Sequence, residues 1–190
     1  MLYGAPTARR QDAQRNRAAI VRAASEVMTS GGSVVPMPEI ARRAGVGQAT
    51  LYRHFPDRSA LAAAVVAHHL QRLEAFVATE ACGPAMFRHL LREVLHTQVA
   101  MRPLVLLARR FDADARGRYQ KRLLAAFREP LRRAQSEGYV RSDLSPADLL
   151  LLFAMVQGVA EATDELADAQ AAADRSIDLV LDGVCPGRPT

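Results

Sequence analysis

A short polar segment in the first third of the chain carries the side chains best suited to contacting nucleic acid. Positions 48–58 read Gln-Ala-Thr-Leu-Tyr-Arg-His-Phe-Pro-Asp-Arg. The amide of Gln48 can pair bidentately with adenine, which makes it the candidate for reading a base. Hydroxyl, phenol and imidazole groups can bond to phosphate, so we expect Thr50, Tyr52 and His54 to hold the DNA backbone.

The distribution of charge points to the same part of the chain. The net charge is +5; residues 1–58 hold nine Arg against two Asp and two Glu, whereas residues 59–190 hold sixteen basic and sixteen acidic side chains. Clustered cations beside an electroneutral remainder indicate an N-terminal nucleic-acid-binding unit, although a basic surface tail gives the same count. Arg58 joins the candidates because backbone amides at a helix start already favour phosphate. A surface ion pair with Asp57 or Glu39 is its alternative role.

Two short helices must position these residues. Pro38 suits the first turn of a helix over 38–44, glycines mark a turn at 45–47, and a second helix runs from about 48 to 54. This spacing is typical of a helix-turn-helix, whose second helix enters the major groove of DNA. The residues expected to face inward are Ile40, Ala41, Val46, Leu51, Phe55 and the ring of Tyr52. Those available to DNA are Gln48, Ala49, Tyr52, Arg53 and His54.

The rest of the chain has the composition and periodicity of helices. Aromatic residues make up only 5% of the whole chain. Apolar residues at helical spacing predict further helices that begin near residues 11, 57, 84, 114, 146 and 171, and a short, strongly apolar segment spans 104–111. Residues 1–9 show no apolar period and are predicted to form a flexible arm. Arg9 and Arg10 in this arm could enter a minor groove, or simply belong to a disordered tail. The sequence therefore predicts an all-α fold of about nine helices.

Five stretches resemble the TetR family of transcriptional regulators. Asp12-Ala-Gln-Arg-Asn-Arg-Ala-Ala-Ile-Val-Arg-Ala-Ala24 resembles the first helix of that family. Glu39-Ile-Ala-Arg-Arg-Ala-Gly-Val46, Gly47-Gln-Ala-Thr-Leu-Tyr-Arg-His-Phe-Pro56 and Arg58-Ser-Ala-Leu61 resemble its recognition segment almost residue by residue. Residues 133–144 resemble a subgroup of the family. Ala49 stands where the family often has Gly, and Arg58 where it often has Lys; both departures leave the operator sequence open.

The resemblance implies an all-helical homodimer. Residues 1–56 would form a three-helix DNA-binding domain, and residues 57–190 a helical bundle for ligand binding and dimerisation. Most relatives repress transcription until a small molecule binds. We therefore expect a repressor whose partners are a near-palindromic double-stranded DNA operator, a second copy of the chain and a small organic effector.

Other function classes remain open at this stage. A helical protein–protein interaction module could use the basic head to meet an acidic partner, and a constitutive DNA-binding dimer would need no effector. The sequence has no G-x-S-x-G, H-E-x-x-H, P-loop or Rossmann glycine pattern, so we expect no enzyme and no cofactor. His68-His69 with Cys82 matches no zinc-site spacing, so we expect no metal.

Two sites in the second domain are predicted from helical faces. A pocket that is mostly apolar with a few polar groups would suit an organic effector, although the same residues could form an ordinary core. Its candidate residues are Phe87, His89, Leu91, Val94, His96, Leu107, Phe111, Tyr119, Leu123 and Phe127. The run 149–156 is apolar on every side, which predicts a helix buried all round by a partner subunit. The candidate dimer residues are Ala154, Gly158, Ala162, Ile177, Val180, Leu181 and Val184.

The sequence also bears on where the chain acts. Its longest apolar run has eight residues, too few to span a membrane, and no apolar stretch follows Arg9 and Arg10 as in a signal peptide. Its two cysteines, Cys82 and Cys185, lie far apart and form no disulfide framework. We expect a cytoplasmic protein without membrane contact.

Overall fold

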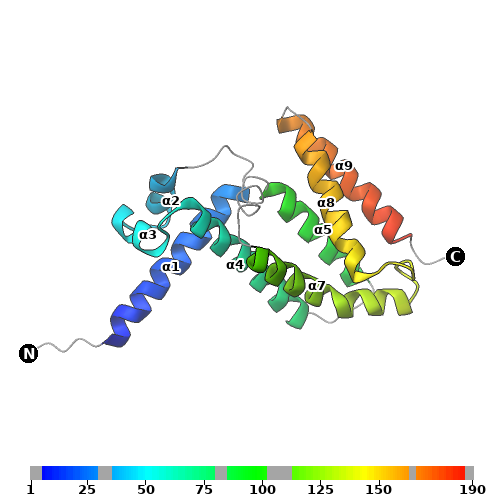
Figure 1. The fold of residues 1–190 in the computed structure, drawn as a ribbon, viewed down its shortest axis with the longest axis horizontal. Coiled ribbons are helices and arrows are strands. Elements are labelled where there is room, and N and C mark those ends of the chain that lie inside the picture. Colours follow the sequence, from blue (N-terminus) through cyan, green and yellow to red (C-terminus); the bar gives the residue numbers. More distant parts are fainter. Residues whose placement is uncertain (1–5, 30–35, 80–84, 102–112, 163–165, 187–190) are drawn as a thin grey trace, which may run out of the picture. The chain divides into compact units, whose positions relative to one another are not determined.

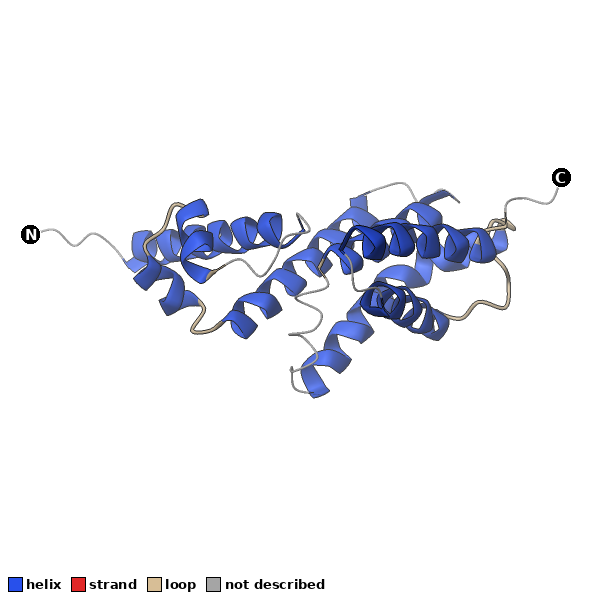
Figure 2. Cartoon of the chain, turned by 90° about the horizontal axis from the view of Figure 1, so that it is seen from above, coloured by secondary structure: helices blue, strands red, loops and turns tan. Residues whose placement is uncertain are grey.

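The computed structural model describes residues 6–29, 36–79, 85–101, 113–162 and 166–186. Every regular element in these ranges is an α-helix, which confirms the predicted all-α fold (Figures 1 and 2). The described residues form two compact units: the head, which extends to His69, and the body, which starts at Leu70. The division falls inside α4 (Arg58–Thr79), whereas the boundary expected from the sequence lies between residues 56 and 57.

The head is a small bundle built on α1 (Pro6–Thr29), which packs against α2 (Met37–Arg43) and α3 (Gln48–His54). The limits of α2 and α3 lie within one residue of those predicted. One apolar face of each helix is buried in this bundle, together with the first half of α4. The fully buried side chains include Ile20, Ala24, Ile40, Leu51, Leu61, Ala62 and Val65.

Helix α4 begins with a side-chain cap. Asp57 Oδ1 accepts a hydrogen bond of 2.7 Å from the amide of Ala60, which satisfies one of the free donors of the first turn. Farther along, Ser25 Oγ and His69 Nε2 lie 2.8 Å apart and connect α1 to α4. Within the head, α4 is thus fixed both at its start and at its middle.

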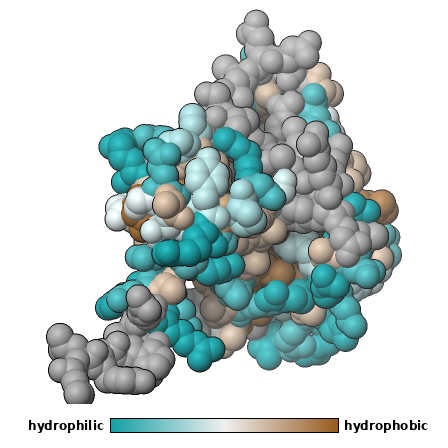
Figure 3. Space-filling model, turned by 60° about the vertical axis from the view of Figure 1, so that its left-hand side comes forward, coloured by the Kyte–Doolittle hydropathy of each residue, from teal (hydrophilic) through white to brown (hydrophobic). Residues whose placement is uncertain are grey.

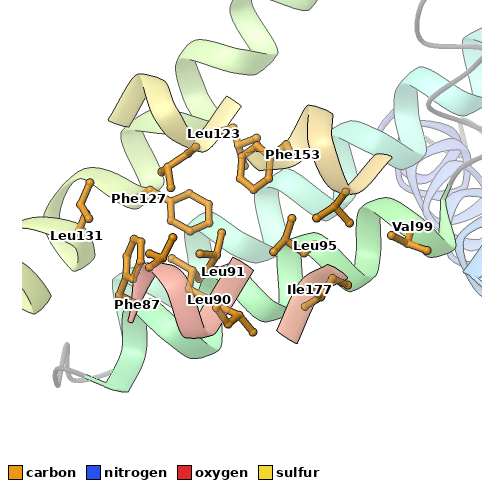
Figure 4. Close-up of a cluster of buried hydrophobic side chains, with 14 of the residues drawn as sticks. Phe87, Leu90, Leu91, Leu95, Val99, Leu123, Phe127, Leu131, Phe153 and Ile177 are labelled. Atoms are coloured by element: carbon orange, nitrogen blue, oxygen red, sulfur yellow. The ribbon is translucent and has the colours of Figure 1, made fainter. Parts of the chain in front are cut away.

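The body contains the second half of α4, together with α5 (Ala85–Ala100), α7 (Ala113–Ser136), α8 (Pro146–Ala162) and α9 (Leu166–Val184). Helix α5 packs against α7, α8 and α9, and α8 packs along α9 (Figure 1). Phe127 lies at the centre of the core, with ring centroids 6.1 Å from Phe87 and 5.9 Å from Phe153 (Figure 4). Tilted and edge-on rings at these distances are favourable arrangements for aromatic pairs.

Ion pairs reinforce the contact between α5 and α9. Their partners recur every four residues on each helix, so the pairs follow one another along the two antiparallel helices. They are Arg88–Asp182 at 2.8 Å, Arg92–Asp178 at 3.1 Å and His96–Asp174 at 3.4 Å. Each pair is partly exposed, so it contributes modestly to stability.

Two expectations about elements need correction. Helix α1 begins at Pro6, so residues 6–9 are helical rather than part of an arm; proline suits a first helical turn because its missing amide is not needed there. Helix α9 begins at Leu166 rather than near 171. Helix α8 leaves part of its apolar surface open within one chain, where Leu151 and Met155 are 62% and 60% exposed, and its burial by a partner subunit stays a prediction.

Candidate DNA-binding surface

The turn between α2 and α3 is closed by a Schellman motif. The amide of Val46 donates to Ala41 O at 3.0 Å and that of Gly45 to Arg42 O at 3.2 Å. Gly45 has φ +68°, in the left-handed region that a residue with a Cβ enters only with strain. The chain then turns at Gly47, whose carbonyl accepts the amides of the first turn of α3.

Helix α3 has one buried and one exposed face, as a recognition helix requires. Leu51 is fully buried and anchors α3 to the head. Gln48, Ala49 and Arg53 are exposed, and Thr50 is half-buried. These placements agree with the outward assignment made from the sequence.

Tyr52 departs from its expected packing. Its side chain is 45% exposed, so the prediction that its ring packs in the core is wrong. The ring follows Leu51 by one residue, and that step of about 100° turns it away from the buried face. The phenol is therefore more available for contacts outside the head than the sequence suggests.

His54 is less accessible than a phosphate-binding residue should be. Its Nε2 atom is buried and makes no hydrogen bond. Burial lowers the pKa of His54, and the nearby charges of Arg53 and Arg17 lower it further. The imidazole therefore favours its neutral form, and its buried Nε2 is not placed to bond to a phosphate in this conformation. The phosphate contact expected of His54 stays a prediction for the rest of the ring.

Phe55 forms the base of the recognition helix, as predicted. Its side chain is 2% exposed, and the guanidinium carbon of Arg17 lies 5.2 Å from the ring centroid. A cation over an aromatic face is attracted by the ring. Arg17 of α1 therefore covers the end of α3 and adds a positive charge beside it.

A groove opens between α2 and the start of α3. Its volume is about 640 Å³, and Pro36, Pro38, Glu39, Arg42 and Gln48 are among its lining residues. Hydrophilic side chains cover most of the described surface turned to the viewer in Figure 3. Gln48, the predicted base-reading residue, thus borders an open depression whose exposed lining is mostly apolar.

Glu39 lies on this surface and was absent from the residues selected from the sequence. It bonds to both Arg42 and Arg43 of α2. The signal was present in the sequence as Glu39-Ile-Ala-Arg42-Arg43, because residues three and four apart share a helix face. The pairing also leaves Glu39 engaged with α2, away from the alternative ion pair considered for Arg58.

Arg58 occupies the first position of α4 and is half-buried. Asp57, its other alternative partner, caps the amide of Ala60 instead. Within the part of the chain that the structure describes, no carboxylate bonds to the Arg58 guanidinium. Arg58 therefore remains suited to the phosphate contact predicted for it.

The predicted effector residues do not form one lining. Phe87, Leu91, Leu123 and Phe127 pack together in the core, with Val94 half-buried against them (Figure 4). His89 is exposed and lies beside Phe76, with ring centroids 5.7 Å apart, so its assignment to an interior wall is wrong. His96 pairs with Asp174 on α9. Tyr119 is 36% exposed, and Leu107 and Phe111 lie outside the described residues.

A buried amide in the body is not among the residues predicted from the sequence. Gln157 of α8 is 3% exposed, and its Nε2 donates to Glu161 Oε1 at 2.9 Å. An ionised carboxylate only accepts hydrogen bonds, so the Gln157 amide turns its Nε2 toward Glu161 and its oxygen away from it. This oxygen is buried and has no hydrogen-bond partner. Gln157 directly follows the apolar run 149–156, a setting in which a polar residue is noticeable.

The predicted dimer residues divide into two groups. Ala154, Gly158 and Ala162 of α8 are exposed, and their spacing of four residues places them on one face of the helix. The assignment of Ile177, Leu181 and Val184 to the interface is wrong, because these α9 side chains are buried in the core of their own chain. Val180 is half-buried against the same core. Among the described side chains of α9, Leu179 is a large apolar residue that is 56% exposed.

Two kinds of feature are absent from the described residues. They contain no group of three His, Cys, Asp or Glu side chains placed to hold a metal ion. None of their helices combines the length and the apolar character needed to cross a membrane.

Sequence comparison identifies the two halves of the chain separately. Residues 20–65 match the tetR family of bacterial regulatory proteins, and residues 81–186 match the C-terminal domain of SbtR-like transcriptional regulators. An HTH-type transcriptional regulator of Mycobacterium bovis is 31% identical over 159 residues, which are 77% of this chain and 78% of the relative. A Mycobacterium tuberculosis regulator shows the same identity and coverage.

Solved structures agree with the sequence matches. A TetR transcription regulatory protein from Mycobacterium vanbaalenii superposes with a TM-score of 0.64 at 30% identity, covering 93% of this chain and 98% of that protein. A TetR transcriptional regulator from Streptomyces coelicolor gives a TM-score of 0.65 at 30% identity, covering 92% and 99%. With a helix-turn-helix head and a helical body both matched, this chain belongs to the TetR family of helix-turn-helix transcriptional regulators.

Proposed function

We propose that the protein represses transcription by binding a near-palindromic operator as a homodimer, and that a small organic effector releases it. The observation that carries this proposal is the two-sided helix α3. Leu51 anchors α3 in the head, while Gln48, Tyr52 and Arg53 remain exposed. A helix held in this way can enter a major groove with its first turn against the base edges.

In this proposal the exposed residues of the head have separate tasks. Gln48 reads a base edge, since its amide offers both a donor and an acceptor. Thr50, Tyr52, Arg53 and Arg58 contact phosphates and fix the register. Ala49 lies between them and can approach a thymine methyl group.

Dimerisation is supported by the apolar face that α8 leaves exposed. Leu151 and Met155 lie one turn apart on this face, and Leu179 of α9 is exposed as well. Ala154, Gly158 and Ala162 would allow a second helix to approach closely. A four-helix contact formed by α8 and α9 of two subunits would cover these residues across a two-fold axis.

Effector binding is supported by the buried amide of Gln157. An acceptor that is buried without a partner is unfavourable by about 1–3 kcal/mol and calls for an explanation. We propose that its oxygen accepts a hydrogen bond from an N–H or O–H group of the effector. The remaining contacts would be apolar, as in most small-molecule sites.

Selection of bound duplexes from a random library tests the proposed operator. A repressor should enrich one sequence with two related half-sites, spaced about 34–36 Å or a multiple of this apart. Its binding should weaken steeply with salt, because phosphate contacts release counterions. Failure to enrich any sequence would contradict sequence-specific binding and favour a protein–protein module with a basic head.

A further inference from the structure

A carboxylate lies among the cations of the proposed DNA-binding surface. Glu39 accepts hydrogen bonds from Nε and Nη2 of Arg42, both at 2.7 Å, and from Nε of Arg43 at 2.9 Å. These bonds stabilise the charged carboxylate and hold the pKa of Glu39 at about 2. Glu39 is therefore ionised at any pH near neutrality.

The location of these three residues, the Glu39 triad, connects them to base reading. Glu39 and Arg42 line the same groove as Gln48. The Arg42 side chain is 74% exposed, so it is accessible from solvent. A duplex placed with its bases against Gln48 would bring phosphates near the triad, where they would meet one carboxylate together with two guanidinium groups.

We propose that Glu39 is a specificity-determining residue, which limits the sequence-independent affinity of the head for DNA by engaging Arg42 and Arg43. The inference rests on the proposal that α3 enters the DNA groove. Glu39 occupies the Nε and Nη2 edge of Arg42, which is the edge that would otherwise bind a phosphate in bidentate fashion. The triad thus offers DNA a net charge of one instead of two.

The pairing of Glu39 with Arg42 and Arg43 lowers mainly the affinity for non-specific DNA. Their affinity comes almost entirely from phosphate contacts, which any cation within reach can make. On the operator, base contacts fix the register, so a released arginine finds fewer phosphates at a suitable distance. A hydrogen bond from Gln48 to a base does not depend on Glu39, so the base-reading share of the affinity is retained.

The body contains a matched control. Glu129 of α7 bonds to Arg132 Nε at 2.8 Å, to Arg132 Nη2 at 2.7 Å and to Arg133 Nε at 2.6 Å. The residue types and spacing are those of the Glu39 triad, and the pKa of Glu129 is likewise about 2. This second triad lies on α7 of the body, outside the proposed DNA-binding surface. A substitution at Glu129 therefore measures the effect of losing one negative charge and one such triad without changing that surface.

The test compares Glu39→Gln with Glu129→Gln in the full chain, because each removes one negative charge and keeps the side-chain shape. Binding to a random-sequence duplex is measured over a series of salt concentrations. We expect Glu39→Gln to bind about fivefold tighter, the factor for one unit charge at about 4 Å in water. The salt slope should steepen by about 0.9 for each phosphate newly contacted. Glu129→Gln should match the unsubstituted chain.

The outcomes separate this inference from the proposed function. Equal binding by the two variants, or weaker binding by Glu39→Gln, overturns the proposed limit on sequence-independent affinity. If Glu39→Gln raises the affinity for the selected operator as much as for random duplex, the specificity role is overturned. If the unsubstituted chain binds no duplex at low salt, DNA binding by the head fails, and the role of Glu39 fails with it.

Discussion

Gln48 and Arg58 should contribute to DNA binding in physically different ways. Gln48 is exposed in the first turn of α3, whereas Arg58 lies at the first position of α4. We expect Gln48→Ala to relax the preference at one base pair by about 1–3 kcal/mol, since it removes a base contact. Arg58→Ala should weaken binding to all sequences alike and reduce the magnitude of the salt slope by about one per protomer.

Affinity measurements on the operator and on single-base variants distinguish the two residues. Each residue serves as the control for the other, because both substitutions truncate a long polar side chain near the same surface. If Gln48→Ala and Arg58→Ala both lose affinity uniformly across sequences, Gln48 does not read a base.

The buried imidazole of His54 predicts a pH dependence of stability. Burial and two nearby arginines lower the pKa of His54 below its ordinary 6.5. The unfolded chain therefore binds more protons in this range, so stability rises with pH. The contribution of His54 is complete above about pH 6.5 and is lost as the pH falls through the lower pKa of the folded state.

Urea denaturation between about pH 7 and pH 5 checks this sign. The variant His54→Gln retains a polar side chain but does not titrate, so it should lose less stability on acidification than the unsubstituted chain. The remaining histidines are common to both proteins and cancel in the comparison. Parallel stability profiles for the two proteins would show that His54 is not the responsible group.

At the scale of elements, the turn before α3 depends on one glycine. The Cβ of an alanine at Gly45 would meet no atom within 4 Å, but φ there is +68°. The penalty of Gly45→Ala is therefore conformational, and we expect it to lower the free energy of unfolding by about 1–2 kcal/mol. Chemical denaturation followed by circular dichroism measures the change.

Gly117 supplies the control for this substitution. It lies inside α7, also with open space around a new Cβ, and its φ is not in the left-handed region. Gly117→Ala should therefore stabilise the protein by up to about 1 kcal/mol, because alanine is the better helix former. A destabilisation of equal size at both glycines would show that backbone handedness is not the cause.

Glycine, proline and capping residues explain which helix limits the sequence predicts well. The start of α3 follows a glycine turn and its end precedes Pro56, so both limits are set by residues whose backbone preferences are strong. Asp57 marks the start of α4 for the same reason. Helix α9 begins earlier than predicted, since the apolar residues that mark its face, such as Ile177, Val180 and Leu181, lie in its second half.

Helical periodicity predicts which residues share an apolar face of a helix, but not what that face packs against. Ile177, Leu181 and Val184 share an apolar face, as expected, yet the structure directs that face to the core of its own chain. A stripe of apolar residues looks the same in sequence whether its partner is intramolecular or another subunit. The Glu39 triad shows the converse case: its spacing is readable in the sequence, but its place beside Gln48 depends on how α2 and α3 pack.

At the scale of the whole molecule, the exposed face of α8 predicts that Gly158→Leu prevents dimerisation. A Cβ at Gly158 meets no atom within 4 Å in one chain, so the larger side chain should leave the subunit folded. It would project where a second helix must approach closely. Sedimentation velocity should show a dimer for the unsubstituted chain and a monomer for the variant. Gly117→Leu, at an exposed glycine of α7, is the control and should remain dimeric.

Sedimentation also decides the proposal itself. An unsubstituted chain that sediments as a monomer at micromolar concentration would reject a dimer through this face. A Gly158→Leu variant that stays dimeric with unchanged secondary structure would place the interface elsewhere.

Release of DNA by an effector should be visible as linkage between two binding sites. Helix α4 has 22 residues and is about 33 Å long. Its first half belongs to the head and its second half to the body, and Arg122 of α7 holds Glu74 of α4 through bonds of 3.0 and 2.7 Å. We expect an effector in the body to bias the position of this helix and so the spacing of two recognition helices.

An effector that weakens operator binding by some factor must itself bind the operator complex more weakly by the same factor. Calorimetric titration of the effector with and without operator measures both affinities. Equal affinities would show that the compound occupies the body without controlling DNA binding. A lower affinity of the effector for the operator complex than for the free protein would establish the coupling.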